Sequence, residues 1–385
     1  MRERNIRHLV ARDETGQITG IVDNHDLLRF YRYSPAMLAQ EARNAQSEEQ
    51  LVAVRRDLPK LVQALIETGA RTRSITRSIT SISDTLTSRL IHLAVAELGT
   101  PPTRFAFLAL GSEGREEQNL ASDQDNTIIF EDGDGQALPV VHEYFIKLGA
   151  LVCKWLDAAG YASCKGEIMA SNLKWCQPLS VWKNYFSQWI FSPEPQNILE
   201  TMTFFDFRVL QGEKELETQL RKHINAQLQQ EPPFLLHCAQ YALQYKIPLV
   251  FFGNIIVAGS DKDDFRTFDI KEAMMPIVNF ARLYALKHQV AGTHTLNRLC
   301  ELMESEIIRK SLHDEVVEVY DYLMQLRLRH QVQMIEQGKA PDKAIAPKNL
   351  TQMEEALLKQ AFTQITNIQK KSVTIFSVWL NRCRF

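Results

Sequence analysis

Two apolar runs of strand length lie in the first half of the chain and are joined by a polar loop. They cover residues 105–110 and 126–130, and each is bounded by polar or small residues. Runs of this length are typical of strands that are buried on both faces. A helical pattern follows over residues 139–159, and we expect a third strand over residues 161–170. This order predicts a small mixed α/β sheet with a site at the strand ends.

Apolar residues at helical spacing flank this sheet on both sides. Residues 36–68 predict one helix, and residues 75–93 predict a second with an apolar stripe every three or four positions. The second helix is either a signalling linker or dimer stalk, or it packs on the domain that follows. Beyond about residue 174 the pattern is helical throughout. The last helices are expected over residues 270–288, 295–310, 314–337 and 350–370, which are lengths typical of a bundle.

Length and composition indicate a globular protein with more than one domain. A chain of 385 residues exceeds what one core normally organises, and 45% hydrophobic with 23% charged residues is ordinary for a soluble protein. The net charge of −2 gives no chain-wide attraction to nucleic acid or to an anionic membrane. No apolar run has the length of a membrane span, and the first residues lack an apolar signal core. We therefore expect a soluble protein without a membrane or nucleic-acid partner.

The six cysteines are scattered along the chain and form no C-x-x-C pair. Because no histidine cluster accompanies them, they do not predict a zinc site. Isolated cysteines of this kind are typical of reduced thiols, so we expect a cytoplasmic protein.

The polar loop between the two central strands carries the candidate chemistry. Residues 111–125 read Gly-Ser-Glu-Gly-Arg-Glu-Glu-Gln-Asn-Leu-Ala-Ser-Asp-Gln-Asp. Side chains two apart on a strand point to one face, so Asp123 and Asp125 can converge on one site. Two carboxylates beside a turn of small residues suit Mg²⁺ held together with a nucleoside triphosphate. Each part alone is more often a simple turn or a solvated loop, but in this order between two strands they favour a site.

This arrangement resembles the nucleotidyltransferase superfamily of the polymerase-β type, whose pattern is Gly-Ser, a short spacer and Asp-x-Asp. With Arg115, Gln118 and Ser122 in place, it is similar to the nucleotidyltransferases found behind CBS modules in bacterial signalling proteins. Those proteins are relatives of the protein-PII uridylyltransferases. The region after residue 175 resembles the substrate-binding part of that family. The matching stretches are residues 204–212, 269–271, 281–282 and 326–331.

The first residues resemble the closing half of a CBS motif. Residues 7–11 and 18–22 are strand-like around a D-x-x-G turn, and Asp26-Leu27-Leu28 opens a helix. Because only this half is present, we expect the chain to be a piece of a longer regulatory protein. The alternative is a simple β-hairpin cap.

The resemblance implies an α+β protein in which a small mixed-sheet nucleotidyltransferase domain of the polymerase-β type precedes an all-α helical bundle. The domains implied are a partial CBS motif over 1–33, a helical linker over 34–100, the transferase domain over 101–195 and a helical substrate-binding domain over 196–385.

The resemblance also implies residue roles and partners. Asp123 and Asp125 would be catalytic and would hold Mg²⁺ or Mn²⁺, with Glu167, or alternatively Asp206, as a third carboxylate. The nucleotide would be bound by Gly111, Ser112, Arg115 and Ser122. Arg115 would contact a phosphate, or would instead form an ion pair with Glu116 or Glu117. The donor would be UTP or ATP, and the acceptor a protein such as a PII-like signalling protein; a homodimer is compatible with the stalk reading.

Two other functions compete with an active transferase. One is a catalytically inactive regulatory module that binds a nucleotide without turnover. The other is nucleic-acid tailing, which the net charge and the lack of a recognisable RNA-binding module disfavour.

Overall fold

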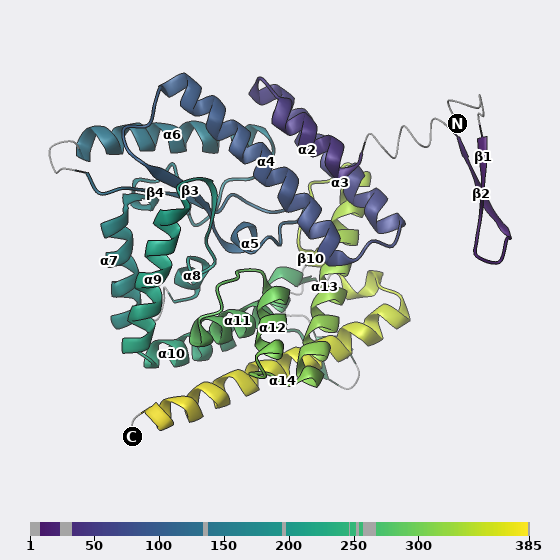
Figure 1. Ribbon diagram of the computed structural model, residues 1–385. Helices are drawn as coiled ribbons and strands as arrows, with labels where there is room; N and C mark the ends of the chain where they lie inside the picture. The colour runs from purple at the N-terminus through teal and green to yellow at the C-terminus, as the bar shows by residue number, and fades with distance from the viewer. Residues whose placement is uncertain are drawn as a thin grey trace, which may run out of the picture.

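Strands β3 (Phe105–Ala109) and β4 (Asn126–Phe130) form the antiparallel centre of a mixed sheet in the computed structural model. Strand β6 (Arg208–Gly212) pairs antiparallel with β3, and the short β5 (Cys176–Pro178) pairs parallel with β4. The strand order is therefore β5-β4-β3-β6 (Figure 1). The expected small mixed sheet is confirmed.

Helices make up most of the rest of the chain. The structure describes residues 8–23, 33–133, 138–194, 198–245, 247–251, 254–256 and 267–383. The α-helices there are α2 (Pro35–Asn44), α3 (Glu48–Glu67), α4 (Thr72–Leu98), α5 (Gly111–Gly114), α6 (Leu138–Ala158), α7 (Leu179–Phe191), α8 (Ile198–Thr203), α9 (Lys214–Gln230), α10 (Pro233–Tyr241), α11 (Ile270–His288), α12 (Thr295–Glu304), α13 (Lys310–Glu336) and α14 (Gln352–Cys383). The 3₁₀ turns in the same described segments are η2 (Leu173–Trp175), η4 (Ala242–Gln244) and η5 (Pro347–Asn349). The other strands there are β1 (His8–Arg12), β2 (Ile18–Asp23), β7 (Leu249–Phe251), β8 (Asn254–Ile256), β9 (Phe268–Asp269) and β10 (Ala344–Ile345).

Both faces of the central sheet are covered, as the two apolar runs require. All of β4 is buried. Helices α4 and α6 lie on one side of the sheet, and α7 and α9 lie on the other (Figure 1). Phe130 of β4 stacks on Phe145 of α6 with ring centroids 4.9 Å apart. From α7, the indole N–H of Trp182 donates to the carbonyl of Ile128 at 3.2 Å.

The apolar stripe of α4 packs against the domain that follows it. Ile79, Leu86 and Leu90 of this stripe are at most 1% exposed. The hydroxyl of Ser83 on the same helix lies 2.7 Å from that of Tyr161. This burial confirms the packing alternative, because the stripe presents no apolar face to solvent.

The strand expected over residues 161–170 is wrong. These residues form an irregular loop with a turn in which the Glu167 N–H donates to the carbonyl of Cys164 at 3.0 Å. The loop still runs beside β4, since its carbonyls accept from the N–H groups of Gln124 and Asn126 at 2.9 and 3.2 Å. It therefore supports the acidic end of β4 without joining the sheet.

Two other secondary-structure expectations also need correction. Helix throughout the region beyond residue 174 is wrong, because β6 returns to the sheet with half-buried residues instead of an apolar run. The sheet thus includes residues on both sides of the boundary predicted at residue 195. The single helix expected over residues 36–68 is two helices, since the chain turns after α2 and α3 begins at its N-cap Ser47.

The second half of the chain is mainly a helical bundle, but the all-α expectation is wrong, because the short strand pairs β7–β8 and β9–β10 lie within it. Helix α11 is buried along most of its length and packs against α12, α13 and α14. Its N-terminus is capped by Asp269, whose carboxylate accepts from the Glu272 N–H at 3.1 Å. Within the part of the chain that the structure describes, no helix combines the length and apolar character needed to cross a bilayer.

The first strands form a small hairpin, which Figure 1 shows apart from the helical body. β1 and β2 pair antiparallel, and the Asp13 carboxylate accepts from the N–H groups of Thr15 and Gln17 in the turn. The helix expected to begin at Asp26-Leu27-Leu28 lies outside the described residues. The partial CBS motif therefore stays a prediction.

Candidate active site

The turn after β3 needs glycine at two positions. Gly111 has a φ of 55°, and a Cβ there would lie 3.1 Å from the Thr203 methyl group. A Cβ on Gly114 would lie 2.0 Å from the carbonyl oxygen of Asp206. The pattern Gly-x-x-Gly is therefore required by the close packing of this turn on its neighbours, whatever else the turn binds.

The two acidic residues at the start of β4 are held in place through their backbone and through the residue between them. The Leu110 N–H donates to the carbonyl of Asp125 at 2.8 Å. The Gln124 side-chain amide donates to the carbonyls of Cys153 and Tyr161 at 3.1 and 2.9 Å. With Gln124 turned into the protein, Asp123 and Asp125 share the opposite face, as the two-residue spacing predicts.

A third side chain joins this pair, and it is a cysteine. One carboxylate oxygen each of Asp123 and Asp125 and the Cys164 Sγ all lie within 4.8 Å of one another. Burial, and then the neighbouring Asp123, raises the pKa of Asp125 to about 6. Burial, and then Asp125, raises the pKa of the Cys164 thiol to about 11. Two carboxylates held this close repel each other, and a divalent cation bound between them would relieve that repulsion. These residues therefore fit a metal ion.

The acidic pair faces a cavity of about 310 Å³ between the sheet and the helical bundle. The sheet side of the lining includes Gly111, Ser112, Arg115, Asp123 and Asp125. The helical side includes three cations, Lys271, Arg282 and Lys343. Cations opposite carboxylates suit a ligand that carries both a metal ion and phosphate groups.

One fully buried carboxylate joins the sheet to the bundle. The Asp206 carboxylate accepts from Arg115 Nη1 at 2.9 Å, from Arg282 Nη2 at 2.6 Å and from Arg298 Nη1 at 2.6 Å. We call these four residues the Asp206 cluster. Burial alone would raise the pKa of Asp206, but the three guanidinium groups hold it well below its usual range. The carboxylate is therefore ionised at neutral pH, and its oxygens accept hydrogen bonds from the three arginines.

Arg115 forms the ion pair that the sequence offered as an alternative, while its contact with a phosphate stays a prediction. It lines the cavity, and its guanidinium pairs with Glu117 at 2.8 Å as well as with Asp206. The ion pair is buried rather than on the surface. Glu117 in turn accepts from the Thr295 N–H at 2.7 Å, which ties the motif to the start of α12.

Three of the predicted site residues do not reach the acidic pair. The Ser122 hydroxyl accepts from the Asn119 N–H at 3.0 Å and is not part of the cavity lining. Glu167 is exposed, on a turn where its φ is 54°. Asp206, the alternative third carboxylate, is held by Arg115, Arg282 and Arg298. Neither carboxylate belongs to the group of ligand atoms that Cys164 completes.

Sequence reasoning assigned no role to Cys164, Lys271 or Lys343. Cys164 stands three residues before Glu167 in the segment searched for a third ligand, so a search for sulfur as well as oxygen ligands would have found it. Lys271 lies in a stretch noted only for its resemblance. No sequence signal marks Lys343.

Two family models match the chain. Residues 56–196 match the family described as "Putative nucleotidyltransferase DUF294", and residues 232–376 match "Putative nucleotidyltransferase substrate binding domain". The two matches lie in the order that the resemblance implied. A search of curated proteins found no match. Strand β6 lies between the two matched regions, although it completes the sheet of the first.

Proposed function

We propose that the protein is a metal-dependent nucleotidyltransferase that moves a nucleoside monophosphate from a triphosphate to an acceptor hydroxyl group. The observation that carries this proposal is the meeting of Asp123 and Asp125 beside the Gly111–Ser112 turn in one cavity. The second matched domain contributes Lys271 and Arg282 to the same cavity. A cavity shared by a transferase and a substrate-binding domain is where the two substrates would meet.

The residues of the site would divide the work as follows. Asp123 and Asp125 would hold Mg²⁺ or Mn²⁺, which when bound neutralises charge on the reacting phosphates. The backbone N–H groups of Gly111 and Ser112 would hold phosphate oxygens, because glycine lets the ligand approach the backbone. Lys271 and Lys343 would balance the charge of the triphosphate from the helical side.

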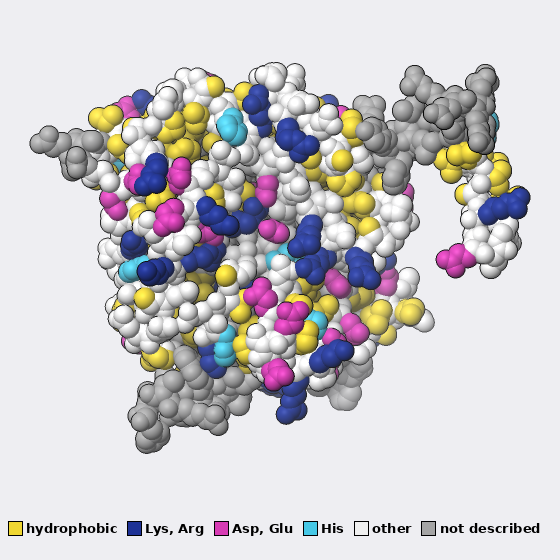
Figure 2. All heavy atoms as spheres, viewed as in Figure 1, with side chains coloured by type: hydrophobic (Ala, Val, Ile, Leu, Met, Phe, Trp, Pro, Cys, Tyr) yellow, Lys and Arg dark blue, Asp and Glu magenta, His cyan; other side chains and the backbone are white. Residues whose placement is uncertain are grey.

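The donor and acceptor are inferred from the resemblance to protein-PII uridylyltransferases. On that basis we propose UTP or ATP as donor and a PII-like signalling protein in the cytoplasm as acceptor. The face shown in Figure 2 carries basic and acidic side chains side by side without a patch of one sign. Such a surface gives little support to a nucleic-acid acceptor, which basic patches favour.

The experiment that tests this proposal is a transfer assay. The protein is incubated with each α-labelled NTP, with Mg²⁺ or Mn²⁺, and with candidate acceptor proteins. We expect label on an acceptor from one NTP with the native chain and none with Asp123→Ala/Asp125→Ala. Labelling that persists in the double variant would show that the acidic pair is not the catalytic centre.

A second candidate function is a regulatory module that binds a nucleotide without turning it over. It is favoured by the group around Cys164, which holds two carboxylates where the superfamily commonly has three. Absence of transfer with every donor and acceptor, together with undiminished nucleotide binding by Asp123→Ala/Asp125→Ala, would support this function over the first.

A further inference from the structure

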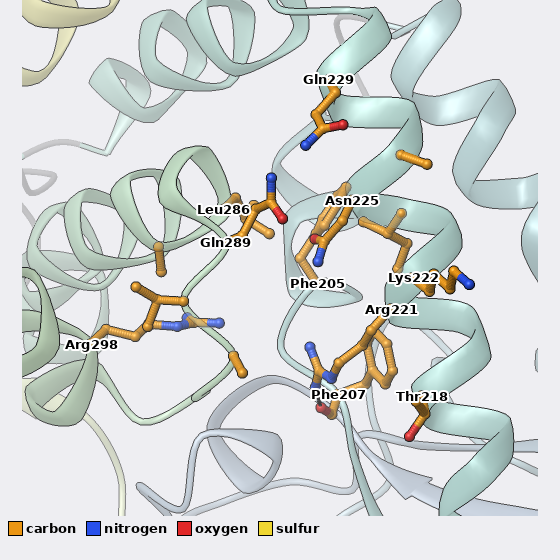
Figure 3. A pocket seen from close by; sticks show the side chains of 15 residues that line it. Phe205, Phe207, Thr218, Arg221, Lys222, Asn225, Gln229, Leu286, Gln289 and Arg298 are labelled. Carbon is orange, nitrogen blue, oxygen red and sulfur yellow. Dashed lines mark hydrogen bonds between the residues drawn. The ribbon is translucent and has the colours of Figure 1, made fainter.

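A second cavity lies between α9 and the end of α11 (Figure 3). It measures about 550 Å³, which is within the range of small-molecule sites. The two cavities are lined by different sets of described residues. Phe205, Phe207 and several aliphatic side chains contribute apolar surface to the second cavity, and polar side chains line part of it. The proposed transferase reaction makes no use of this space.

Two arginines face the second cavity from opposite sides, Arg221 from α9 and Arg298 from α12 (Figure 3). The Arg221 Nε donates to Glu217 at 2.8 Å, its Nη2 donates to the Phe207 carbonyl, and its guanidinium lies 4.0 Å from the centre of the Phe207 ring. The Arg298 Nε donates to the Gly292 carbonyl at 2.7 Å, and its Nη1 donates to Asp206. Both guanidinium groups are therefore fixed in orientation before any ligand arrives.

Each arginine keeps one nitrogen for a ligand. Within the described residues, Arg221 Nη1 and Arg298 Nη2 donate to no acceptor, and neither belongs to the buried polar atoms that lack a partner. These nitrogens belong to side chains that line the cavity. Arginine N–H groups pair with phosphate and carboxylate oxygens in short, charge-assisted hydrogen bonds.

The charges around the second cavity favour an anion. Among the described residues, its lining contains Arg221, Lys222 and Arg298 but no aspartate or glutamate. Arg298 shares its carboxylate partner Asp206 with two other arginines. Its positive charge is therefore only partly compensated, and a bound anion would compensate the rest.

The other polar side chains of the lining are mainly amides. Asn225 and Gln289 point toward one another across the space in Figure 3, and Gln229 lies one helical turn further along α9. An amide offers both a donor and an acceptor, as does the edge of a nucleobase. The cavity is also much larger than a phosphate ion requires, so the anion should carry an organic body.

We propose that this second cavity binds a nucleoside monophosphate or a similar phosphate monoester. The phosphate would lie between Arg221 and Arg298, and the base would face the amides of Asn225 and Gln289. This inference does not depend on the transferase reaction, because binding alone tests it.

The test is isothermal titration of the full chain with UMP, AMP and inorganic phosphate, in EDTA so that no metal-dependent binding contributes. We expect a nucleoside monophosphate to bind, and to bind more tightly than inorganic phosphate. Asn225→Ala should weaken this binding up to about tenfold, the effect of one lost hydrogen bond to the base. Ala226→Trp, at an exposed lining position, should abolish it by filling the space.

Two control variants locate the ligand. Gln230→Ala lies on the same helix outside the lining and should bind like the native chain, whereas Gln229→Ala should bind more weakly. Lys271→Ala alters the first cavity and should leave this binding unchanged. The proposal is overturned if no nucleoside monophosphate binds, if inorganic phosphate binds as tightly, or if binding survives Ala226→Trp and is lost in Lys271→Ala.

Discussion

The ammonium group of Lys271 lies 3.8 Å from a carboxylate oxygen of Asp123, across the cavity that separates the bundle from the sheet. Both side chains are about one-third exposed, so this ion pair adds little to stability. The same lysine is held by the well-capped start of α11, which points it at the acidic pair. The position of Lys271 therefore fits a role in ligand binding better than a role in stabilising the fold.

Replacing Lys271 by alanine should weaken the binding of nucleoside triphosphate without unfolding the protein. Loss of one charge-assisted contact to phosphate corresponds to about a tenfold rise in Kd. Titration with a non-hydrolysable triphosphate and Mg²⁺ measures this change, and thermal unfolding measures stability. Lys339→Ala, an exposed lysine outside the cavity, is the control. Equal Kd values for the two variants would show that Lys271 does not contribute to triphosphate binding.

Gly111→Ala should damage the site more than the fold. A Cβ at this position would lie 2.9 Å from Asp125 Oδ2, and the φ of 55° adds about 1 kcal/mol of strain for alanine. The Asp125 carboxylate must therefore move. We expect transfer activity and metal affinity to fall at least about tenfold while the unfolding free energy drops by only ~1–3 kcal/mol. Gly133→Ala, where nothing lies within 4 Å, is the matched control.

The central strands and the acidic pair could be predicted because their signals are local. Residues 105–110 and 126–130 are continuous apolar runs, and the two aspartates follow a period of two along one strand. The bundle helices are also long enough that the spacing of apolar residues within each of them predicts a helix. These features depend on the sequence within a few residues of each position.

The parts that could not be predicted depend on contacts between distant residues. Strand β6 has no apolar run and exists because it pairs with β3. Asp206 was noted as a possible ligand, but its partners Arg282 and Arg298 stand 76 and 92 residues further along. No spacing rule connects such positions. The sequence therefore predicts which residues could act, and the fold decides which of them meet.

Asp206→Asn should destabilise the protein strongly. The substitution leaves three buried guanidinium groups without their shared carboxylate, and breaking a buried ion pair in this way costs about 3–5 kcal/mol. Urea unfolding at pH 7 measures the loss. The exposed pair of Glu143 with Lys147 provides the control, since Glu143→Gln should leave stability nearly unchanged. Similar values for the two variants would contradict the structural role of the Asp206 cluster.

The Asp206 carboxylate also sets a pH dependence. Its folded-state pKa lies below the ordinary value of 3.8, so its contribution is present above that value and is lost as the pH falls further. Stability that depends on this carboxylate should thus be constant from pH 5 to 8.

Glu113→Gln should change the dependence of stability on pH in the opposite sense. Burial, and then the nearby Asp84, raises the pKa of Glu113 from 4.5 to about 8, although Arg208 opposes the shift. A raised pKa means that the contribution of this group is complete below pH 4.5 and is lost as the pH rises toward 8. The glutamine variant should be more stable than the native chain at pH 8 by at least about 1 kcal/mol. Its advantage should vanish near pH 5.

Unfolding curves at several pH values measure this difference. Glu215→Gln, an exposed carboxylate on α9, is the control and should show no such trend. A stability difference between Glu113→Gln and the native chain that stays constant from pH 5 to 8 would contradict the buried, protonated state of Glu113.

Cys164 should raise the affinity of the acidic pair for soft cations such as Cd²⁺ without changing its affinity for Mg²⁺. A thiolate prefers Cd²⁺ or Zn²⁺, whereas carboxylates alone suit Mg²⁺. We expect Cd²⁺ to bind the native chain with a thiolate-to-metal absorption band in the ultraviolet and with release of the thiol proton. Cys164→Ser should remove the band and weaken Cd²⁺ at least about tenfold, while Mg²⁺ affinity changes by less than about twofold.

The partly exposed Cys300 supplies the comparison, because it lies outside the group of ligand atoms formed by Asp123, Asp125 and Cys164. Cys300→Ser should keep the absorption band at full strength. A band that survives Cys164→Ser, or one that is lost in Cys300→Ser, would show that Cd²⁺ binds elsewhere. In that case the short approach of Cys164 to the two carboxylates would be a packing contact without a role in metal choice. Because the readout is absorbance, it is independent of whether nucleotidyl transfer is observed.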